Sequence, residues 1–460
     1  QCGGAYGYRD QLQDLTNIGL FSPDLLKQHI VRSAFHQFEE GDVQHWWHNI
    51  STEKDKGHLG VRTRYSDDML WLVYAVCEYI DLTGDYSILD IKVEYISDRP
   101  LDENEDEYCG IPNRSGKREK IFEHCLKAIY SAGKVGPNGI ILIRGGDWND
   151  GMNKVGDENS GESTWLSWFF ANVCDRFADI CEDRGENATA GELREFATAV
   201  RMNIEKNCYD GKWYLRGYHK DGSKIGAEGD DECEIDLISQ SFAAITSKSM
   251  IDRKITALNS VYERLYDKKT GILKLFTPPF IEGKREIGYI KGYVAGIREN
   301  GGQYTHAAAW GAIAFLAIGD SKRGYEIISS LNPLNLIDSD EKLEKYGAEP
   351  YVIAADIYTN PDQYGRAGWT WYTGAAGWIL KAIFQYLLGV KFYKGKIDVI
   401  PCVPEEWQGF EVSFCKSNTK VIIRAKPANS KEEKGKYIKG EKTDGFIDIS
   451  GEEVIIDVLY

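Results

Sequence analysis

The sequence lacks long apolar runs and an excess of positive charge, and each absence excludes a class of partner. No apolar stretch in the 460 residues approaches the roughly 18 residues of a membrane-spanning helix. The formal net charge of −16 argues against nucleic acid, whose phosphates would be repelled. A small anion can still bind where a few arginines converge. Hydrophobic residues at 42% and charged residues at 27% are typical of an ordinary soluble globular protein.

Signatures of metal, nucleotide and serine-hydrolase sites are also missing. The ten cysteines are scattered without a CxxC pair, which argues against a zinc cluster. There is no GxGxxG, P-loop or HExxH motif, and no GxSxG in a strand–turn–helix setting. We therefore expect neither a metal nor an organic cofactor.

The cysteines and the first residue bear on the cellular setting. Several cysteines lie in apolar helical patterns, as Cys77 does in "LVYAVCEYI", where a reduced core thiol is expected. Reduced thiols favour a reducing compartment, so we expect a cytoplasmic location. The chain starts at Gln1 with neither Met nor a signal peptide, so its natural N-terminus and any targeting signal are expected to lie outside it.

Up to about residue 390, apolar residues recur mainly at helical spacing. "DDMLWLVYAVCEYIDLTGDY" places Leu72, Val76 and Ile80 on one face, with Ser66 or Asp67 as a candidate cap. "THAAAWGAIAFLAIGD" and "GAAGWILKAIFQYLLGV" are apolar nearly all round, as buried helices are. Between the helices lie loops rich in Gly, Trp, Asp and Arg that are too long to be mere connectors.

These patterns predict a mainly α fold with a small β domain at its C-terminus. About 390 residues allow about twelve helices at ~30 residues per helix and loop, which form either a solenoid or a double-ring barrel. No fixed-period repeat is evident, which favours an (α/α)6 barrel over residues 1–388. After Val390, stretches such as "FEVSFCKSNTKVIIRAKP" alternate as strands do, so residues 389–460 are expected to form the β domain.

The loop "ILIRGGDWNDGMNKVG", residues 141–156, holds the first candidate site residues. Asp147 is most simply explained by hydrogen bonds to backbone amides in a Gly-rich turn. Asp150 fits that explanation less well, because Trp148 lies two residues away and its ring can stack on a sugar. An acid beside an indole ring can keep its proton near neutrality through desolvation, and a protonated acid can cleave a glycosidic bond.

Three further loops carry polar groups just before a helix. In "GVRTRYSDDMLWL", Arg62, Arg64 and Asp68 either form surface ion pairs or clamp sugar hydroxyls, with Arg62 and Asp68 gripping adjacent ones. In "GYVAGIRENGGQYTHAAAW", Glu299, Gln303 and His306 surround a glycine pair at a helix start, where anions are attracted, and Gln303 is expected to contact the substrate.

The last of these loops is "GRAGWTWYTGAAGWIL". Here Thr373 and Gly374 precede an apolar helix, so that hydroxyl and amide donors can meet one oxyanion. One of Trp369 and Trp371 is expected in the core. Four Gly- and Trp-rich loops bearing acids, arginines and a histidine suit carbohydrate chemistry with an anionic co-substrate.

Six motifs, in order along nearly the whole chain, resemble glycoside hydrolase family 94, the cellobiose and chitobiose phosphorylases. They are "GGAYGYRDQLQD" (3–14), "GDWNDGMNKVG" (146–156), "ECEIDLISQSF" (232–242), "GYIKGYVAGIRENGGQYTHAAAW" (288–310), "EPYVIAADIY" (349–358) and "GWTWYTGAAGW" (368–378). The second, fourth and "GESTWLSWF" look most like the β-1,2-glucan branch, which includes 1,2-β-oligoglucan phosphorylase and the C-terminal domain of cyclic β-1,2-glucan synthase.

The resemblance implies an (α/α)6 barrel followed by a jelly-roll-like β domain. Family members also carry an N-terminal β-sandwich and a helical linker, which this chain lacks. Two assemblies stay open, a homodimer or pairing with the missing N-terminal region.

The resemblance also implies roles for individual residues. It implies that Asp150 is the general acid, that Trp148, Arg62, Asp68 and Glu299 hold the donor glucosyl unit, and that phosphate is held by His306, Thr373 and Gly374. Arg62 or Arg64 is expected to help neutralise that phosphate.

The implied reaction is inverting phosphorolysis of a β-linked gluco-oligosaccharide, with β-1,2 linkages favoured and α-glucose 1-phosphate as product. An inverting hydrolase needs a second carboxylate to activate water, whereas phosphate is already anionic and nucleophilic. Two alternatives remain open. One is an inverting hydrolase with Glu299 as the base, and the other is a non-catalytic glycan-binding domain of a larger glucan synthase.

Overall fold

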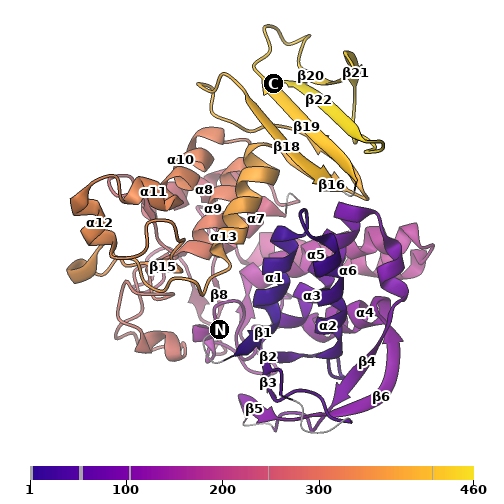
Figure 1. Ribbon diagram of the computed structural model, residues 1–460. Coiled ribbons are helices and arrows are strands. Elements are labelled where there is room, and N and C mark those ends of the chain that lie inside the picture. Colours follow the sequence, from indigo (N-terminus) through magenta and orange to yellow (C-terminus); the bar gives the residue numbers. More distant parts are fainter. Residues whose placement is uncertain (1–3, 51–54, 103–104, 247, 417) are drawn as a thin grey trace.

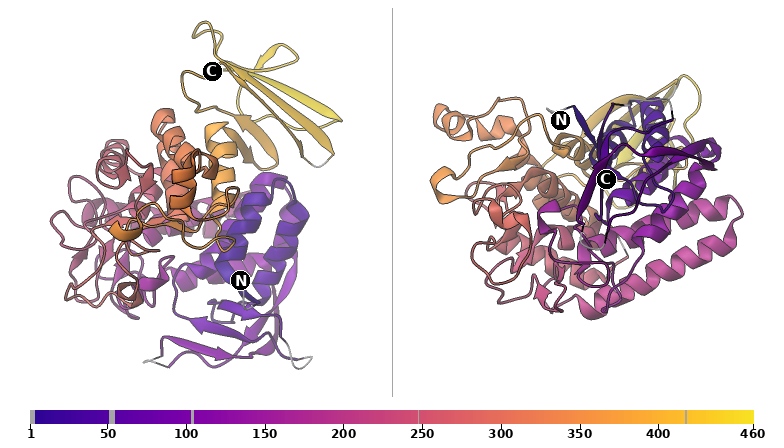
Figure 2. Two further views of the ribbon diagram at one scale, coloured as in Figure 1. Left: turned by 60° about the vertical axis from the view of Figure 1, so that its left-hand side comes forward. Right: turned by 90° about the horizontal axis from the view of Figure 1, so that it is seen from below.

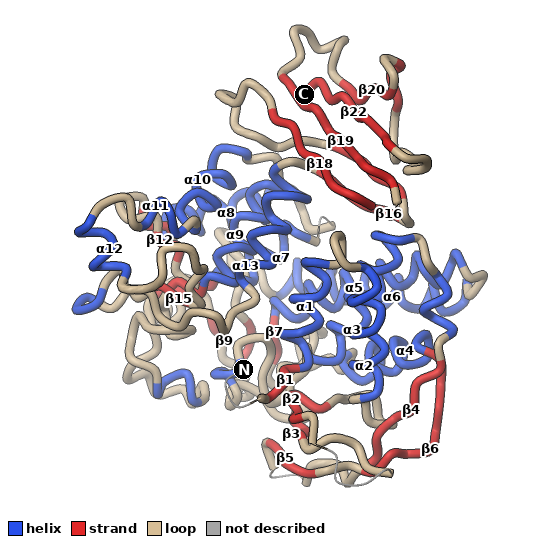
Figure 3. Tube along the Cα trace, in the orientation of Figure 1, coloured by secondary structure: helices blue, strands red, loops and turns tan. Residues whose placement is uncertain are grey.

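The computed structural model describes residues 4–50, 55–102, 105–246, 248–416 and 418–460. The chain is mainly helical up to residue 389 and mainly strands from Val390 onward, and the two parts are shown in Figures 1 and 3. The predicted helix-rich protein with a β-rich C-terminal region is confirmed in that outline. None of the helices among the described residues is both long and apolar enough to cross a membrane.

The larger helices come in sequence order with loops of very unequal length between them. They are α1 Tyr8–Ile18, α2 Pro23–Phe35, α3 Asp68–Thr83, α4 Ile121–Ala132, α5 Thr164–Asp183, α6 Asn187–Asn207, α7 Leu237–Ile245, α8 Ile251–Arg264, α9 Thr305–Ala317 and α10 Ser321–Leu331. Three shorter helices follow, α11 Pro333–Leu336, α12 Asp340–Tyr346 and α13 Ala375–Lys381, and α13 continues directly into a π-helix, Ala382–Leu387.

Helices that are apolar on every side lie inside, and amphipathic ones cover them. All of α9 from Thr305 to Leu316 is buried, as is almost all of α3. Leu72, Val76 and Ile80 are at most 1% exposed, which confirms the predicted core face. Helix α3 stops at Gly84, whose φ of +72° belongs to the left-handed region that glycine adopts at little cost.

Indole and phenyl rings fill the space between the inner helices. Trp310 of α9 lies 4.9 Å from Trp148 and 5.5 Å from Trp378, measured between ring centroids. Trp71 and Trp165, from α3 and α5, stack near Trp310 at 6.5 and 6.0 Å. Rings of this size bury much apolar area and prefer such tilted and edge contacts. They form a rigid floor beneath the loops at the helix N-termini.

Short strands and long loops gather at one end of the helices. One antiparallel sheet has the order β1–β2–β3–β5, formed by Ala5–Gly7, Gln44–His48, Gly60–Thr63 and Glu107–Gly110. Strand β4, Lys92–Ser97, pairs with β6, Asn113–Lys120, and β14, Gln303–Tyr304, pairs with β15, Asp356–Ile357. These segments lie at the end away from the C-terminal sheet (Figures 1 and 2).

Other short pairs link the loops. They join β7 Glu162–Ser163, β8 Gly217–Tyr218 and β9 Lys224–Ile225 in one sheet, β10 Ile235–Asp236 with β13 Phe276–Thr277, and β11 Tyr266–Asp267 with β12 Ile272–Leu273.

The C-terminal region is a hairpin and one five-stranded sheet. The hairpin pairs β16, Val390–Tyr393, with β17, Lys396–Val399. The sheet has the order β18–β19–β22–β20–β21, with strands Phe410–Lys416, Thr419–Lys426, Glu453–Leu459, Gly435–Ile438 and Glu441–Thr443. Its apolar face shares one core with Leu20, Leu82 and Phe384 from the helices. The sheet is therefore packed against the helical part and is not merely tethered to it.

Candidate active site

A cavity of about 760 Å³ opens among the loops at the N-terminal ends of α1, α9 and α13, and we call it the site cavity. Its walls come from segments far apart in the sequence. Of the residues predicted for the site, it is lined by Trp148, Asp150, Glu299, His306, Thr373 and Gly374. The cavity size falls within the range of about 300–1,000 Å³ usual for ligand pockets.

Asp150 reaches the cavity because the loop before it turns sharply. Gly146 has a φ of +135°, and a Cβ there would lie 2.5 Å from the ring of Tyr65, so a larger residue is excluded. Four residues later Asp150 starts the 3-10 helix Asp150–Met152, and its side chain, which lines the cavity, is 30% exposed.

Asp147, in the same loop, is structural. Its carboxylate accepts hydrogen bonds from the Asn149 backbone N–H at 3.0 Å, the Arg216 guanidinium at 2.7 Å and the Ser163 hydroxyl at 2.6 Å. The side chain is fully buried. The turn-stabilising role predicted for Asp147 is thus observed, with an added buried ion pair to Arg216 that the local sequence gave no sign of.

Arg9 of α1 organises the acids around Asp150, and sequence reasoning missed it. Its guanidinium donates to Asp150 Oδ1 at 2.5 Å and to Asp67 Oδ1 at 2.9 Å, and lies 3.6 Å from Asp68. It also donates to the backbone carbonyls of Asp147 and Trp148, both at 3.2 Å. Arg9 therefore fixes both the loop and the acid. The only available signal was its place in the "GYRDQLQD" motif.

Asp67 stands at the N-cap position of α3, but its side chain belongs to this cluster of acids around Arg9. Its carboxylate accepts from Arg9 and, at 3.0 Å, from Trp71 Nε1, and it makes no capping hydrogen bond. The predicted cap position is therefore observed, but its carboxylate is bound by a buried arginine and does not bond the backbone of the first turn. Burial and the neighbouring Asp68 raise the pKa of Asp67 to about 7, against the lowering effect of Arg9.

His45 of β2 is a second residue that the sequence did not single out. Its Nδ1 lies 2.8 Å from Asp68 Oδ2 and its Nε2 lies 3.8 Å from Asp150 Oδ2. Burial lowers its pKa, but Asp68, by charge and hydrogen bond, and Asp150 together raise the pKa of His45 to about 9. The imidazole is therefore cationic near neutrality. Asp68 itself is buried and does not line the site cavity, so it orients His45 and Arg9 and does not reach the cavity space.

His306 also lines the site cavity, but its imidazole faces an amide and not a carboxylate. Its Nε2 lies 2.9 Å from Gln13 Oε1, which also accepts from Trp378 Nε1 at 3.1 Å. Because the atom that accepts the Trp378 N–H is the amide oxygen of Gln13, it has no hydrogen to donate. Nε2 of His306 therefore carries the hydrogen and donates it to this oxygen, and Nδ1 keeps a free lone pair. Burial and Arg9 lower the pKa of His306 to about 3, so the ring is neutral.

Gly374, Thr373 and Asp14 meet beside that ring. A Cβ placed on Gly374 would lie 3.2 Å from Asp14 Oδ1 and 3.5 Å from His306 Nδ1, which shows how closely the three approach. Thr373 Oγ1 accepts from the Ala375 backbone N–H at 3.0 Å, at the start of α13. Burial and then the charge of Asp10 raise the pKa of Asp14 to about 7. Asp14 is a third missed residue, one helical turn beyond Asp10 on α1.

Glu299 and Arg298 line the cavity together. Glu299 Oε2 is buried without a hydrogen-bond partner and lies 3.4 Å from Arg298 Nε, and burial raises its pKa. Arg298 has a φ of +53° and places its guanidinium 4.6 Å from the rings of both Tyr293 and Trp369. A non-glycine residue in this region is strained, and such strain gathers at functional sites.

Gln303 is not placed at the cavity. Its side-chain oxygen accepts from the Leu273 backbone N–H at 2.9 Å, and the side chain is buried. The substrate contact predicted for Gln303 is therefore corrected to a structural role.

The aromatic rings of the cavity divide into one at the base and two at the rim. Trp148 is 8% exposed, and its ring contacts His306 and Tyr304 at centroid distances of 5.2 and 5.3 Å. Trp369 and Trp371 are 57% and 68% exposed. The expectation that one of these two is a core residue is wrong, because both lie on a loop outside the ring-filled interior. Exposed flat rings beside a cavity are suited to stacking on sugars.

The structure does not bring Arg62 and Arg64 to the site cavity. Arg62 donates to Asp42 at 2.6 and 2.8 Å and to Glu40 at 3.1 Å. Arg64 pairs with Glu158 and donates to the Asp102 carbonyl at 2.6 Å. Both line a separate cavity of about 460 Å³. The predicted sugar clamp and phosphate contact are corrected accordingly, because both side chains are held by acids that line this other cavity, Arg62 by Glu40 and Asp42 and Arg64 by Glu158.

Comparison with known proteins agrees with the sequence motifs. Residues 1–389 match the sequence model of the glycosyl hydrolase 94 superfamily, catalytic domain. The chain is 39% identical over 411 residues to the cyclic beta-(1,2)-glucan synthase NdvB of Rhizobium meliloti, covering 89% of this chain and 14% of that protein. It is 31% identical over 408 residues to solabiose phosphorylase of Paenibacillus borealis, covering 87% of this chain and 48% of that protein.

A solved structure shares the fold. A GH78 family rhamnosidase of Bacillus sp. GL1 superposes with a TM-score of 0.52 at 12% identity, covering 99% of this chain and 40% of that one. The chain thus spans less than half the length of each of these three proteins.

Proposed function

The chain belongs to the glycosyl hydrolase 94 superfamily, and from that premise we propose that it is the catalytic part of an inverting glycoside phosphorylase. It cleaves β-linked gluco-oligosaccharides with inorganic phosphate and releases α-glucose 1-phosphate. The observation that carries the proposal is the meeting of Asp150 with His306, Thr373 and Gly374 at one cavity. Its similarity to solabiose phosphorylase supports the same reaction type.

Asp150 is the proposed general acid, and its two carboxyl oxygens have different partners. Oδ1 accepts from Arg9, which leaves Oδ2 to carry the proton. That proton passes to the glycosidic oxygen as the bond from the anomeric carbon to this oxygen breaks. The carboxylate that results is stabilised by Arg9 and by the cationic His45, 3.8 Å from Oδ2. General acid catalysis of this kind typically contributes about 10²–10⁴-fold.

Phosphate is the proposed nucleophile, attacking the anomeric carbon from the face opposite the departing oxygen. The hydroxyl of Thr373 and the backbone of Gly374, at the positive end of α13, are proposed to hold it. A protonated phosphate oxygen can donate to His306 Nδ1, the lone pair of which faces Gly374. Phosphate brings its own negative charge, so no metal, cofactor or second catalytic base is proposed.

We propose that the helices of residues 1–388 form an (α/α)6 barrel and that residues 389–460 form a separate jelly-roll-like domain. The largely buried α3, α5 and α9, with amphipathic helices around them, support an inner and an outer ring. Oligosaccharide and phosphate are the proposed partners. A homodimer and pairing with an N-terminal region both remain compatible with a chain that spans less than half the length of its relatives.

A preference for β-1,2 linkages is the finer part of the proposal. It is supported by the 39% identity to a protein named for cyclic β-1,2-glucan. The test is a panel of β-1,2, β-1,3 and β-1,4 gluco-oligosaccharides incubated with phosphate and assayed for glucose 1-phosphate. Fastest release from a linkage other than β-1,2 would contradict the preference but not the phosphorylase.

An inverting hydrolase is the second candidate, and Glu299 is the observation that favours it. Its buried oxygen without a hydrogen-bond partner and its raised pKa are what a water-activating base needs. Product analysis with and without phosphate separates the two. Glucose released at equal rates in both conditions would end the phosphorylase proposal. Turnover absent at every phosphate level, with oligosaccharide still bound, would favour a glycan-binding domain.

A further inference from the structure

The cavity of about 460 Å³ that holds Arg62 and Arg64 carries an excess of positive charge, and we call it the arginine cavity. It shares no lining residue with the site cavity. Its lining contains five cations and three acids, namely Arg62, Arg64, Lys127, Lys134 and Arg144 with Glu40, Asp42 and Glu158. The whole chain has a formal net charge of −16, so this excess is a local feature that overall composition does not explain.

Three of the five cations have acid partners. Arg62 and Arg64 pair with the three acids of the lining, and Lys127 Nζ lies 3.6 Å from a carboxylate oxygen of Glu119. Lys134, just after α4, is exposed and forms no ion pair with any residue that the structure describes. Its ammonium group is therefore available to an anion that enters the cavity.

Arg144 is a buried cation of this lining without an acid partner among the described residues. It is 7% exposed, and its Nη2 donates to the Ser131 carbonyl at 2.5 Å. Nε is enclosed without a hydrogen-bond partner, whereas Nη1 keeps solvent-accessible surface and likewise has no partner in the described part of the chain. An arginine stays charged, and a buried charge without a counter-ion is costly. Nη1 is thus an accessible, unused donor of a cation that lacks its counter-ion.

The backbone holds Arg144 in this position at a cost. Its φ of +48° lies in the left-handed region, where a side chain other than glycine is strained. A β-bridge to Tyr65 fixes the segment there. Strain of this kind gathers at functional sites, which is consistent with a binding role for the guanidinium.

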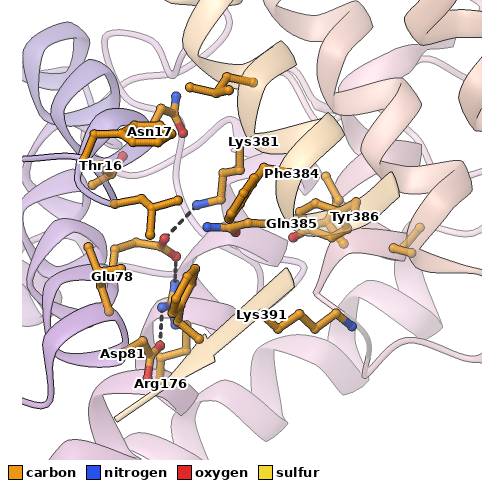
Figure 4. Close-up of a pocket in the computed structure, with 18 residues that line it drawn as sticks. Thr16, Asn17, Glu78, Asp81, Arg176, Lys381, Phe384, Gln385, Tyr386 and Lys391 are labelled. Carbon is orange, nitrogen blue, oxygen red and sulfur yellow. Dashed lines mark hydrogen bonds and ion pairs between the residues drawn. The ribbon is translucent and has the colours of Figure 1, made fainter. Parts of the chain in front are cut away.

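The cavity where the helices meet the C-terminal region shows the opposite arrangement (Figure 4). There Glu78 accepts from Lys381 at 2.7 Å and from Arg176 at 2.8 Å, and Arg176 also donates to Asp81 at 2.6 Å. Each of these two cations has a carboxylate partner, so an anion would have to displace an existing ion pair. An anion that enters the arginine cavity meets two cations without such partners.

The chemistry of the lining favours a phosphate group that carries a hydroxylated body. Two cations without acids match the charge of about −1.5 to −2 on a phosphomonoester at pH 7, and guanidinium N–H groups match phosphate oxygens. The volume is too large for phosphate alone and is typical of a small-molecule site. Glu40, 58% exposed, binds Arg62 through Oε2, which leaves Oε1 to accept from a hydroxyl.

From these observations we propose that the arginine cavity binds a phosphomonoester of a monosaccharide. The phosphate lies on Arg144 Nη1 and the Lys134 ammonium group, and a sugar hydroxyl donates to Glu40. Pro100 and Leu101 supply apolar surface for the sugar ring. The proposal does not rest on the phosphorylase activity, because it uses no residue of the site cavity.

The test is a titration of the whole chain with glucose 6-phosphate, read by hydrogen–deuterium exchange so that the two cavities are distinguished. We expect protection of residues 126–135, with higher affinity for glucose 6-phosphate than for inorganic phosphate, glucuronate or glucose. Arg144→Gln should weaken the affinity read from this segment by about tenfold or more. Lys134→Met, at an exposed position, should weaken it by about threefold and tests the site even where Arg144→Gln does not fold.

Arg118→Gln is the matched control. Arg118 also donates to a backbone carbonyl, that of Lys92 at 3.2 Å, but it is exposed and lies outside the cavity. This variant should bind glucose 6-phosphate as the wild type does.

Several results would overturn the proposal. Protection confined to segments of the site cavity would do so, as would equal affinity in the wild type, Arg144→Gln and Lys134→Met. Inorganic phosphate that binds as tightly as glucose 6-phosphate would contradict the sugar, and glucose or glucuronate that does so would contradict the phosphate. Turnover plays no part in this readout, so the present proposal and the phosphorylase proposal fail separately.

Discussion

The two sides of the site cavity differ in charge, with ionised groups around Asp150 and a neutral histidine beside Gly374. Around Asp150, a buried arginine and a cationic histidine are packed among Asp67 and Asp68. Around Gly374, the histidine is neutral, and the groups facing it are a hydroxyl, a backbone and an acid that holds its proton up to about pH 7. Two histidines, His45 and His306, thus differ by about six pKa units, at about 9 and about 3.

The difference lies in the partner that each imidazole faces. His45 faces the carboxylate of Asp68, which stabilises the cation, whereas His306 faces the amide oxygen of Gln13, which accepts a hydrogen but supplies no full charge. In the proposed reaction, the charged side handles a proton and the uncharged side receives an anion. A fixed carboxylate beside phosphate would repel it, so a neutral environment there is the simpler solution.

Removing the acid should have the largest effect. Asp150→Asn keeps the shape but has no proton to give, so we expect phosphorolysis to fall by about 10²–10⁴-fold. Oligosaccharide binding should remain close to wild type. Steady-state kinetics and calorimetry measure the two quantities, and Asp338→Asn, an exposed acid, is the control. Activity within threefold of wild type in Asp150→Asn would remove Asp150 from the mechanism.

The second largest effect is expected from replacing Arg9, which lies at the centre of the charged side. Arg9→Met leaves the buried Asp67 without its cation and Asp68 with His45 alone, and loss of one partner of a buried ion pair costs about 3–5 kcal/mol. Urea unfolding measures the free energy of unfolding. Arg184→Met removes an arginine that pairs with Asp90 at the surface and should cost about 0–1 kcal/mol. Equal losses in the two variants would show that the buried cluster is not held by Arg9.

On the uncharged side, Thr373→Val removes one hydroxyl without changing the side-chain shape. A hydrogen bond to a charged group contributes about 1.5–3 kcal/mol, so the KM for phosphate should rise by about 10–100-fold. The KM for oligosaccharide should not change, and Thr373→Ser should restore most of the phosphate affinity. Initial rates over a phosphate series give these values. A parallel rise in both KM values would instead indicate a disturbed loop.

The smallest effect concerns pH. The pKa of Asp14 is raised from its ordinary value to about 7, so the side chain is neutral below that pH and charged above it. Between pH 6 and 8 the KM for phosphate should therefore rise severalfold in the wild type. Asp14→Asn should flatten that rise.

The raised pKa of Asp14 also means that the folded state loses stability as pH increases from about 4 to 7, and Asp14→Asn should remove this loss.

If the KM for phosphate of Asp14→Asn rises with pH as steeply as that of the wild type, another group near Gly374 is responsible for the rise. Glu299 is the natural comparison, because its pKa is also raised by burial. Running Glu299→Gln in the same series separates the two acids.

Sequence reasoning found the loops of the site but not the network between them. Asp150, Trp148, His306, Thr373 and Gly374 stand in loops with unusual local composition, so the printed sequence alone pointed to them. Arg9, Asp14 and His45 stand in ordinary amphipathic surroundings. Their importance comes from residues remote in sequence, such as Asp68, 23 positions from His45, and Asp150, 141 positions from Arg9. The same limit explains the misplacement of Arg62, whose motif looked correct while its side chain pairs with Asp42.

The sequence by itself determined the mainly helical fold, the change to strands after Val390 and the loops that carry Asp150, His306 and Thr373. It could do so because periodicity, turn chemistry and motif spacing are local properties. Only the tertiary structure decided which acids share Arg9, which of two histidines is charged and which arginines reach the cavity. Those outcomes depend on distances and burial, and an ion pair or a desolvated ring exists only once remote segments have packed together.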